Sequence, residues 1–111
     1  MYYVYILFSE KDSKLYTGYT HNLKSRLQRH QNGFVIQTRN RRPLRLIHYE
    51  TYLEESDAKR REIFLKGGKG KAELKIQLQN CFAKIGYHPN KISTANAGGP
   101  LSGPYPRLAR V

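Results

Sequence analysis

Aliphatic and aromatic side chains at the start of the chain predict two β-strands joined by a turn. Residues 2–8 (YYVYILF) are all aromatic or aliphatic, which is typical of a buried strand. The polar stretch SEKDSK follows, and LYTGYT at residues 15–20 predicts a second strand. Two short strands around a polar connection indicate an antiparallel hairpin.

A short amphipathic helix is predicted after this hairpin. Thr20 or Asn22 can cap a helix that begins near Leu23, and Gly33 is a suitable C-terminal stop. Positions i, i+3, i+4 and i+7 form one face of this helix: Leu23, Arg26, Leu27 and His30. The two basic side chains therefore share a face with the apolar stripe, where a solvated surface pair would not lie.

One more strand and a second helix are expected farther along. Residues 34–43 form an arginine-rich loop, and LRLIHYETYL at residues 44–53 predicts a third strand. Ser56 is the expected N-cap of a helix over residues 57–66, which GGKG at residues 67–70 should end. The expected inner face of this helix carries Ala58, Arg61, Glu62 and Leu65.

A third helix over residues 71–84 and an irregular tail complete the prediction. The order β-β-α-β-α-α predicts a small α/β domain, with a three-stranded and at least partly antiparallel sheet flanked by helices. Residues 1–86 are expected to form this domain. Residues 87–111 contain four of the five prolines and three glycines, and are expected to be an irregular, mobile tail.

Composition excludes several classes of protein. No apolar run approaches the roughly 20 residues of a membrane span, so no membrane partner is expected. The N-terminus has no basic region ahead of its apolar stretch, so it is not expected to be a secretory signal. The single cysteine, Cys81, excludes an internal disulfide and fits a cytoplasmic location. A zinc site is not expected either, because the four histidines lack metal-site spacing.

Positive charge is concentrated in one part of the chain. There are 20 Lys and Arg against 8 Asp and Glu, a formal net charge of +12. From Ser13 to Tyr49 there is no acidic residue, while eight positive residues occur: Lys14, Lys24, Arg26, Arg29, Arg39, Arg41, Arg42 and Arg45. A separate basic block in a folded region indicates a phosphate-rich partner. The alternative is a solvated surface that serves solubility.

Five features in order and spacing carry a family resemblance. Val4-Tyr5-Ile6 precedes Tyr16-Thr17-Gly18 with a turn between them, and Arg26, His30 and Glu62 follow. This pattern resembles the GIY-YIG nuclease superfamily. The chain looks most similar to its small stand-alone bacterial members, which are related to the N-terminal nuclease domain of the excision-repair incision subunit.

The resemblance covers about residues 1–80 and implies a function. A member of this kind would be a divalent-metal-dependent endonuclease that hydrolyses DNA phosphodiester bonds in DNA repair or recombination. A nuclease unit of this size would also depend on a protein partner or an appended domain for targeting. The implied catalytic residues are Tyr5, Tyr16, Arg26, His30 and Glu62.

Phosphodiester hydrolysis suggests a role for each of these side chains. Glu62 can hold one Mg²⁺ or Mn²⁺, since such an ion keeps several waters and needs only one or two protein carboxylates. Arg26 can pair with the scissile phosphate through its planar fork. Tyr5 or Tyr16 can orient or deprotonate the water, provided that the surroundings lower the phenol pKa. His30 can relay a proton or position a tyrosine.

Further residues are expected to bind the nucleic acid. Gly18 permits a close approach between backbone and substrate. A basic groove is expected to be lined by Lys24, Arg29, Arg39, Arg41 and Arg42. Lys66 and Lys69 are expected to contact DNA phosphates.

Two other functional hypotheses stay open at this point. The chain is alternatively a non-catalytic DNA- or RNA-binding module on the same scaffold, and charge alone does not separate RNA from DNA. A ribosome- or protein-associated basic factor has only the charge and the tail in its favour. Structural roles are also open: Tyr5 and Tyr16 can be core aromatics, and Glu62 can pair with Lys66 at i+4 along a helix.

Overall fold

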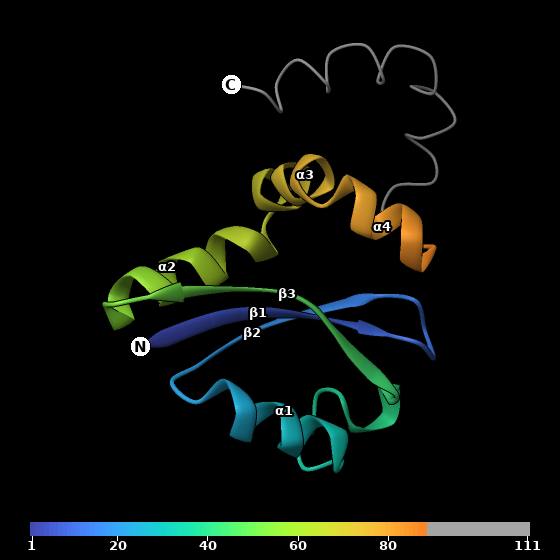
Figure 1. The fold of residues 1–111 in the computed structure, drawn as a ribbon, viewed down its shortest axis with the longest axis horizontal. Coiled ribbons are helices and arrows are strands. Elements are labelled where there is room, and N and C mark those ends of the chain that lie inside the picture. Colours follow the sequence, from blue (N-terminus) through green and yellow to red (C-terminus); the bar gives the residue numbers. More distant parts are fainter. Residues whose placement is uncertain (89–111) are drawn as a thin grey trace.

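The computed structural model describes residues 1–88, so the predicted tail lies outside the described residues apart from Tyr87 and His88. Three strands and four α-helices follow one another within this range (Figure 1). Their order is β1 (Tyr2–Ser9), β2 (Leu15–Thr20), α1 (Leu23–Gln31), β3 (Leu44–Tyr52), α2 (Glu55–Lys66), α3 (Gly68–Gln77) and α4 (Gln79–Ile85). A short 3₁₀ helix, η1 (Arg39–Arg41), lies between α1 and β3.

The sheet has the strand order β2-β1-β3, and β1 is antiparallel to both of its neighbours. Tyr5 at its centre lies opposite Gly18 of β2 and Tyr49 of β3. The register with β3 shifts between Ile6 and Leu7. These pairings confirm the predicted three-stranded α/β fold and show that the described sheet is antiparallel throughout.

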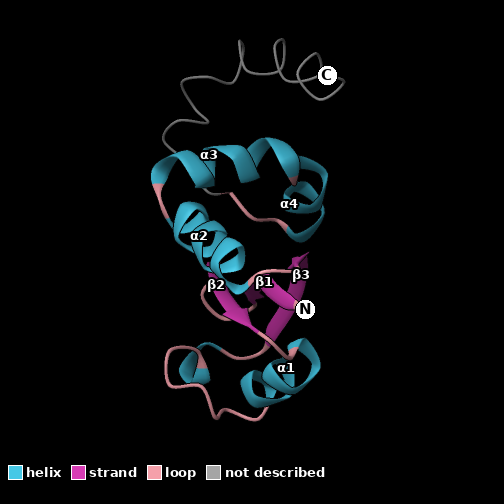
Figure 2. Cartoon of the chain, turned by 90° about the vertical axis from the view of Figure 1, so that its left-hand side faces the viewer, coloured by secondary structure: helices cyan, strands magenta, loops and turns pink. Residues whose placement is uncertain are grey.

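Helices cover the two faces of this sheet unequally. Figure 1 shows α1 below the sheet and α2, α3 and α4 above it, and the turned view in Figure 2 keeps this order. Because successive side chains of a strand point to opposite faces, β1 supplies both layers. Val4 and Ile6 join a core with residues of α2, α3 and α4, whereas Tyr5 and Leu7 join a second core that includes Leu27 of α1.

The C-terminal helices differ from the sequence prediction. The second helix begins at Glu55 with Glu54 as its N-cap, so the expected cap at Ser56 is wrong. The GGKG stretch ends α2 after Lys66 as expected, but α3 begins at Gly68 and not near residue 71. Gly70 is buried where α3 crosses the end of α2, and a Cβ there would overlap the backbone of Phe64 and Leu65. Close helix packing has overridden the low helix propensity of glycine.

A second difference concerns the predicted helix over residues 71–84. It consists of two helices, α3 and α4, with Leu78 between them in a non-helical conformation. The break lets Phe82 of α4 reach the core of Val4 and Ile6. Tyr87, beyond α4, packs its ring against Phe82 at a centroid distance of 4.8 Å. No helix within residues 1–88 is long and apolar enough to cross a membrane.

A charged network ties β3 to the helices above it. Glu50 accepts hydrogen bonds from Arg61 of α2 at 2.9 and 3.2 Å, from His48 at 2.9 Å and from the Tyr52 hydroxyl at 2.6 Å. Arg61 also pairs with Glu73 of α3 at 2.8 Å. Burial alone would raise the pKa of the Glu50 carboxyl, but these hydrogen bonds outweigh it and lower the pKa to about 2.

Replacing Glu50 by Gln should therefore destabilise the fold. We expect the free energy of unfolding near pH 7 to fall by about 1.5–3 kcal/mol, the range for hydrogen bonds to a charged group. Because the folded-state pKa is depressed, this stabilisation is complete above the ordinary value of 4.5 and is lost as the pH falls toward about 2. Urea unfolding at several pH values measures it.

Glu54→Gln is the matched control, since Glu54 is exposed and its side chain does not cap α2. We expect this variant to unfold within about 0.5 kcal/mol of the parent protein. Equal stability of Glu50→Gln and Glu54→Gln near pH 7 would show that the network contributes nothing to the fold.

Candidate active site

Helix α1 positions two of the predicted site residues. The Asn22 side chain caps the helix by accepting a hydrogen bond from the backbone N–H of Ser25 at 3.0 Å, and the helix ends at Asn32 before Gly33 with φ +80°. Leu27 packs into the core below the sheet, which turns Arg26 and His30 toward the same face. His30 is fully buried and Arg26 is half-buried.

The Tyr5 hydroxyl is the point where these side chains meet. Tyr5 is fully buried, and its Oη lies 2.8 Å from Nε2 of His30. Arg26 donates from Nε to the same oxygen at 3.4 Å. On its other side, Nδ1 of His30 lies 2.7 Å from the Thr38 hydroxyl. A continuous polar chain thus runs from Thr38 through His30 and Tyr5 to Arg26.

Tyr16 and Gly18 on β2 complete this cluster. The Tyr16 ring lies 6.3 Å from the Tyr5 ring and 5.2 Å from the His30 ring, centroid to centroid. Gly18 lies directly opposite Tyr5, and a Cβ at this position would overlap the Tyr5 phenol. The space above Gly18, where the sequence predicts substrate, is occupied by Tyr5 in this structure.

Electrostatics keep Tyr5 and His30 neutral. Burial is the largest cause that raises the pKa of Tyr5 to about 12; the Arg26 hydrogen bond opposes it, and the charges of Tyr16 and Glu62 add to it. Burial, followed by the nearby Arg26 charge, lowers the pKa of His30 to about 4. The shift at Tyr5 is opposite to the one that a tyrosine base would need.

Glu62 lies on α2, which covers the face of the sheet opposite α1 (Figure 1). Its side chain is 21% exposed, and its carboxylate pairs with Lys66 at 2.9 Å, as the helix-pair hypothesis expected. Among the causes that shift the pKa of Tyr5, the charge of Glu62 is the smallest, and it raises that pKa. Within residues 1–88 it forms no hydrogen bond with the Tyr5–His30–Arg26 group.

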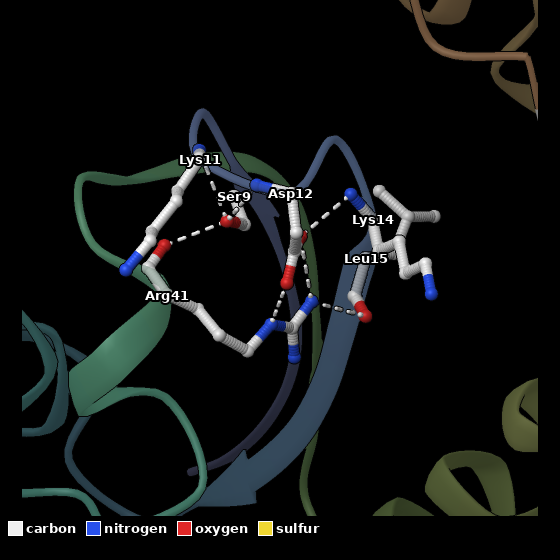
Figure 3. A network of polar contacts seen from close by, with 6 residues as sticks. All are labelled: Ser9, Lys11, Asp12, Lys14, Leu15 and Arg41. Carbon is white, nitrogen blue, oxygen red and sulfur yellow. Dashed lines mark hydrogen bonds and ion pairs between the residues drawn. The ribbon is translucent and has the colours of Figure 1, made fainter.

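The basic residues predicted to line a groove fall into two sets. Arg41 binds Asp12 at 2.6 Å and also donates to the backbone oxygen of Leu15, while the Ser9 hydroxyl donates to the Arg41 backbone oxygen at 2.6 Å (Figure 3). Arg42 donates to the backbone oxygens of Arg39 at 3.0 Å and Gln31 at 3.2 Å. These two guanidinium groups therefore hold the loop to the rest of the domain.

The other predicted nucleic-acid contacts are exposed. Arg29 lies over the exposed Phe34 ring at 6.0 Å, and the Arg39 side chain has no hydrogen-bond partner within residues 1–88. Lys24 lies two positions before Arg26 and points to another side of α1, where it lines a groove with Tyr3 and Tyr49. Lys66 and Lys69 are exposed at the junction of α2 and α3, apart from the loop.

The side chains that could bind a metal near the cluster suit one hard divalent cation at most. Among residues 1–88 no three His, Cys, Asp or Glu side chains gather as a metal site. Glu62 is the carboxylate that the sequence predicts to hold the ion, and Mg²⁺ commonly binds one or two carboxylates together with waters and substrate phosphates. The chemistry of Glu62 therefore fits a divalent ion that is held jointly with a phosphate.

Sequence reasoning missed two contributors to this region. Thr38 is fully buried against His30, yet it lies in a polar, arginine-rich stretch that predicts an exposed loop. Asp12 anchors Arg41 from a turn 29 residues earlier. Neither pairing has a local signal in the sequence, because both depend on how the loop after α1 folds back on the hairpin.

The fold and the Tyr-Arg-His cluster define a small α/β domain of nuclease type. The family model described as the GIY-YIG catalytic domain matches residues 1–76, and the chain belongs to the GIY-YIG family. This domain is a nuclease fold, which implies nuclease-type activity with DNA as substrate.

Small bacterial proteins are among the similar chains. A UPF0213 protein of Clostridium perfringens is 43% identical over 67 residues, which cover 60% of this chain and 71% of that protein. One of Pediococcus acidilactici, named for its place in the ldhD 5′ region, is 39% identical over 82 residues, 71% of this chain and 83% of that protein. One of Staphylococcus haemolyticus is 40% identical over 76 residues, 68% of this chain and 92% of that protein. No solved structure gives a significant match.

Replacing Gly18 by Ala should displace the Tyr5 ring and weaken the cluster. Because the new Cβ would overlap the phenol, we expect the free energy of unfolding to fall by about 1–3 kcal/mol, as for other overpacked cores. Urea denaturation measures the loss. Gly68→Ala is the control, since a Cβ at Gly68 meets nothing within 4 Å. If Gly18→Ala and Gly68→Ala have the same free energy of unfolding, the position of the Tyr5 ring does not depend on the missing side chain at Gly18.

Proposed function

We propose that this protein is a divalent-metal-dependent endonuclease that hydrolyses phosphodiester bonds in DNA. The observation that carries the proposal is the half-buried Arg26, which donates a hydrogen bond to Tyr5, a residue whose pKa the charge of Glu62 also raises. One phosphate-binding cation and one carboxylate that suits a metal thus accompany a neutral tyrosine and histidine. The family membership supports the same reaction class.

Arg26 is proposed to bind the scissile phosphate. A guanidinium has five N–H donors, and the hydrogen bond to Tyr5 uses the one on Nε. The remaining donors suit the non-bridging oxygens, where negative charge grows in the transition state. The hydrogen bond to Tyr5 fixes the direction of the fork and raises the pKa of Arg26, so the side chain stays charged.

Glu62 is proposed to hold one Mg²⁺ or Mn²⁺. A bound divalent ion supplies charge neutralisation and a more acidic water in reactions of this class. In this structure the Glu62 carboxylate forms an ion pair with the Lys66 ammonium, and a bound divalent ion would replace that ammonium. Lys66 would then be free to contact a DNA phosphate.

His30 and Tyr5 are proposed to position Arg26 rather than to touch DNA, since both are fully buried. Tyr16 is half-exposed and is the tyrosine proposed to contact the attacking water. We further propose a role in DNA repair or recombination, with a targeting partner, on the resemblance to the excision-repair incision subunit. A cytoplasmic location belongs to the same proposal.

The burial of Tyr5 and His30 also favours a second candidate, a DNA- or RNA-binding module without turnover. Two of the five predicted catalytic side chains have no surface with which to contact a substrate. Such a module would bind nucleic acid through the exposed basic residues and would not depend on Glu62. Cleavage assays separate the two candidates.

Cleavage should require both Glu62 and Arg26. With Mg²⁺ or Mn²⁺ and a panel of duplex, flapped, branched and single-stranded DNA, we expect Glu62→Gln and Arg26→Ala to lose activity by about 10²–10³-fold. The reason is the loss of the metal carboxylate or of the phosphate-binding cation. Gel analysis of labelled substrates measures the rates.

Matched surface variants serve as controls for this assay. Glu54→Gln removes an exposed carboxylate, and Arg60→Ala removes an arginine that is 72% exposed. Both should cleave at close to the parent rate. If all five proteins cut equally well, the nuclease is a contaminant or acts from another site. Binding without cleavage under every condition would favour the module.

Arg39→Ala should weaken DNA binding without affecting stability, because its exposed side chain has no intramolecular partner within residues 1–88. The loss of one phosphate contact should reduce the slope of log K against log salt by about 1. Arg41→Ala should instead lower stability, since it removes the pair with Asp12. Fluorescence anisotropy and urea unfolding measure the two effects. An unchanged salt slope for Arg39→Ala would contradict its assignment.

A further inference from the structure

Phe34 is an aromatic side chain that is 63% exposed at the start of the arginine-rich loop. Its backbone N–H donates to the oxygen of Arg29 at 2.9 Å, and its own oxygen accepts from the Arg29 guanidinium at 3.4 Å. Gly33 before it has φ +80°, which turns the chain out of α1, and Val35 after it is buried. An ordered backbone therefore holds this ring at the surface.

Arg29 supports the ring as well as the backbone of Phe34. The guanidinium carbon lies over the ring, 6.0 Å from its centroid, an arrangement in which cation and ring attract each other. The same guanidinium binds the Phe34 backbone oxygen. The two side chains thus form one exposed unit, the Phe34–Arg29 pair.

This pair lies beside the candidate active site. Arg29 follows Arg26 by three positions, so the two side chains are neighbours on one flank of α1. The loop that carries Phe34 is also joined to the cluster, because the Thr38 hydroxyl lies 2.7 Å from Nδ1 of His30. A strand whose phosphate is bound by Arg26 would therefore have its next nucleotide near Phe34.

The charges around the ring select the kind of ligand. No acidic residue lies between Ser13 and Tyr49, and Asp12, just before this stretch, is paired with Arg41. Cations that surround an aromatic ring suit a nucleic acid strand, because the cations bind phosphates while the ring stacks on a base. A base in a continuous duplex is already stacked on both faces, whereas an unpaired base has a free face for Phe34.

We propose that the Phe34–Arg29 pair is a stacking site for an unpaired base next to the phosphate bound by Arg26. The preferred DNA would then contain a single-stranded or branched segment at the point of attack. This substrate class rests on the proposed nuclease function, whereas the stacking itself does not need cleavage.

DNA binding without divalent metal tests the site. Fluorescence anisotropy compares one labelled oligonucleotide as a single strand and after annealing to its complement. Phe34→Leu keeps an apolar side chain but removes the ring, so we expect it to weaken single-strand binding about tenfold and duplex binding less than about twofold. Phe34→Tyr keeps the ring and should bind as the parent protein does. No loss in Phe34→Leu, or an equal loss for both DNAs, would overturn the proposal.

Leu53→Ala is the control for removing an exposed apolar side chain. Leu53 is 76% exposed and lies between β3 and α2, away from the loop, so this variant should bind both DNAs as the parent protein does. Phe34→Leu should keep the urea midpoint of the parent protein, because the ring is exposed. A lower midpoint would show that the ring serves the fold, and would overturn its assignment to DNA.

Stacking also has a direct optical signature. The fluorescence of 2-aminopurine in a single strand falls when the base stacks on an aromatic ring. We expect quenching by the parent protein and by Phe34→Tyr, and much less by Phe34→Leu. Equal quenching by Phe34→Leu would assign the stacking to another aromatic side chain. If the parent protein cuts no DNA, the nuclease proposal fails, while the binding and quenching measurements still decide the role of Phe34.

Discussion

A phenol hydroxyl that is removed from water must find its hydrogen bonds inside the protein, and this requirement organises the lower half of the domain. Tyr5 lies on the central strand with no exposed surface, so its oxygen depends on His30 and Arg26. Both partners belong to α1, and α1 must therefore lie at one rotation and one height against the sheet. Gly18 is part of the same constraint, because the phenol occupies the space of a side chain on β2.

Some arginines of this chain are tied up in intramolecular hydrogen bonds and others are exposed, and the sequence alone does not distinguish the two groups. The Arg41 side chain pairs with Asp12, and the Arg42 side chain donates hydrogen bonds to backbone oxygens. These contacts give the loop between α1 and β3 a defined shape. Arg39, two residues before Arg41, keeps its side chain exposed. A guanidinium has enough donors to bind several backbone oxygens at once, so the same residue type that braces the loop is also the one proposed to contact phosphate.

Side-chain alternation and turn residues predicted the three strands and α1 within a residue or two, because these signals are local. The motif around Tyr5, Tyr16, Arg26 and His30 likewise led to one real cluster. The break at GGKG falls after Lys66 as expected, but the next helix begins at Gly68 and not near residue 71, since the packing of Gly70 on α2 is a tertiary effect. Thr38 escaped notice for the same reason: its partner lies eight residues away across a turn, and only the folded loop brings them together.

The sheet separates two cores, and all three strands supply side chains to both. Val4 and Ile6 belong to the layer of α2, α3 and α4, while Tyr5 and Leu7 belong to the layer of α1. Proteins open in cooperative units that often follow such layers. The α1 layer, with one short helix and a loop, can open while the other layer and β1 remain folded. Arg26 and His30 of the site would then lie in the less protected unit, and the amides of α1 would exchange hydrogen earlier than those of β1.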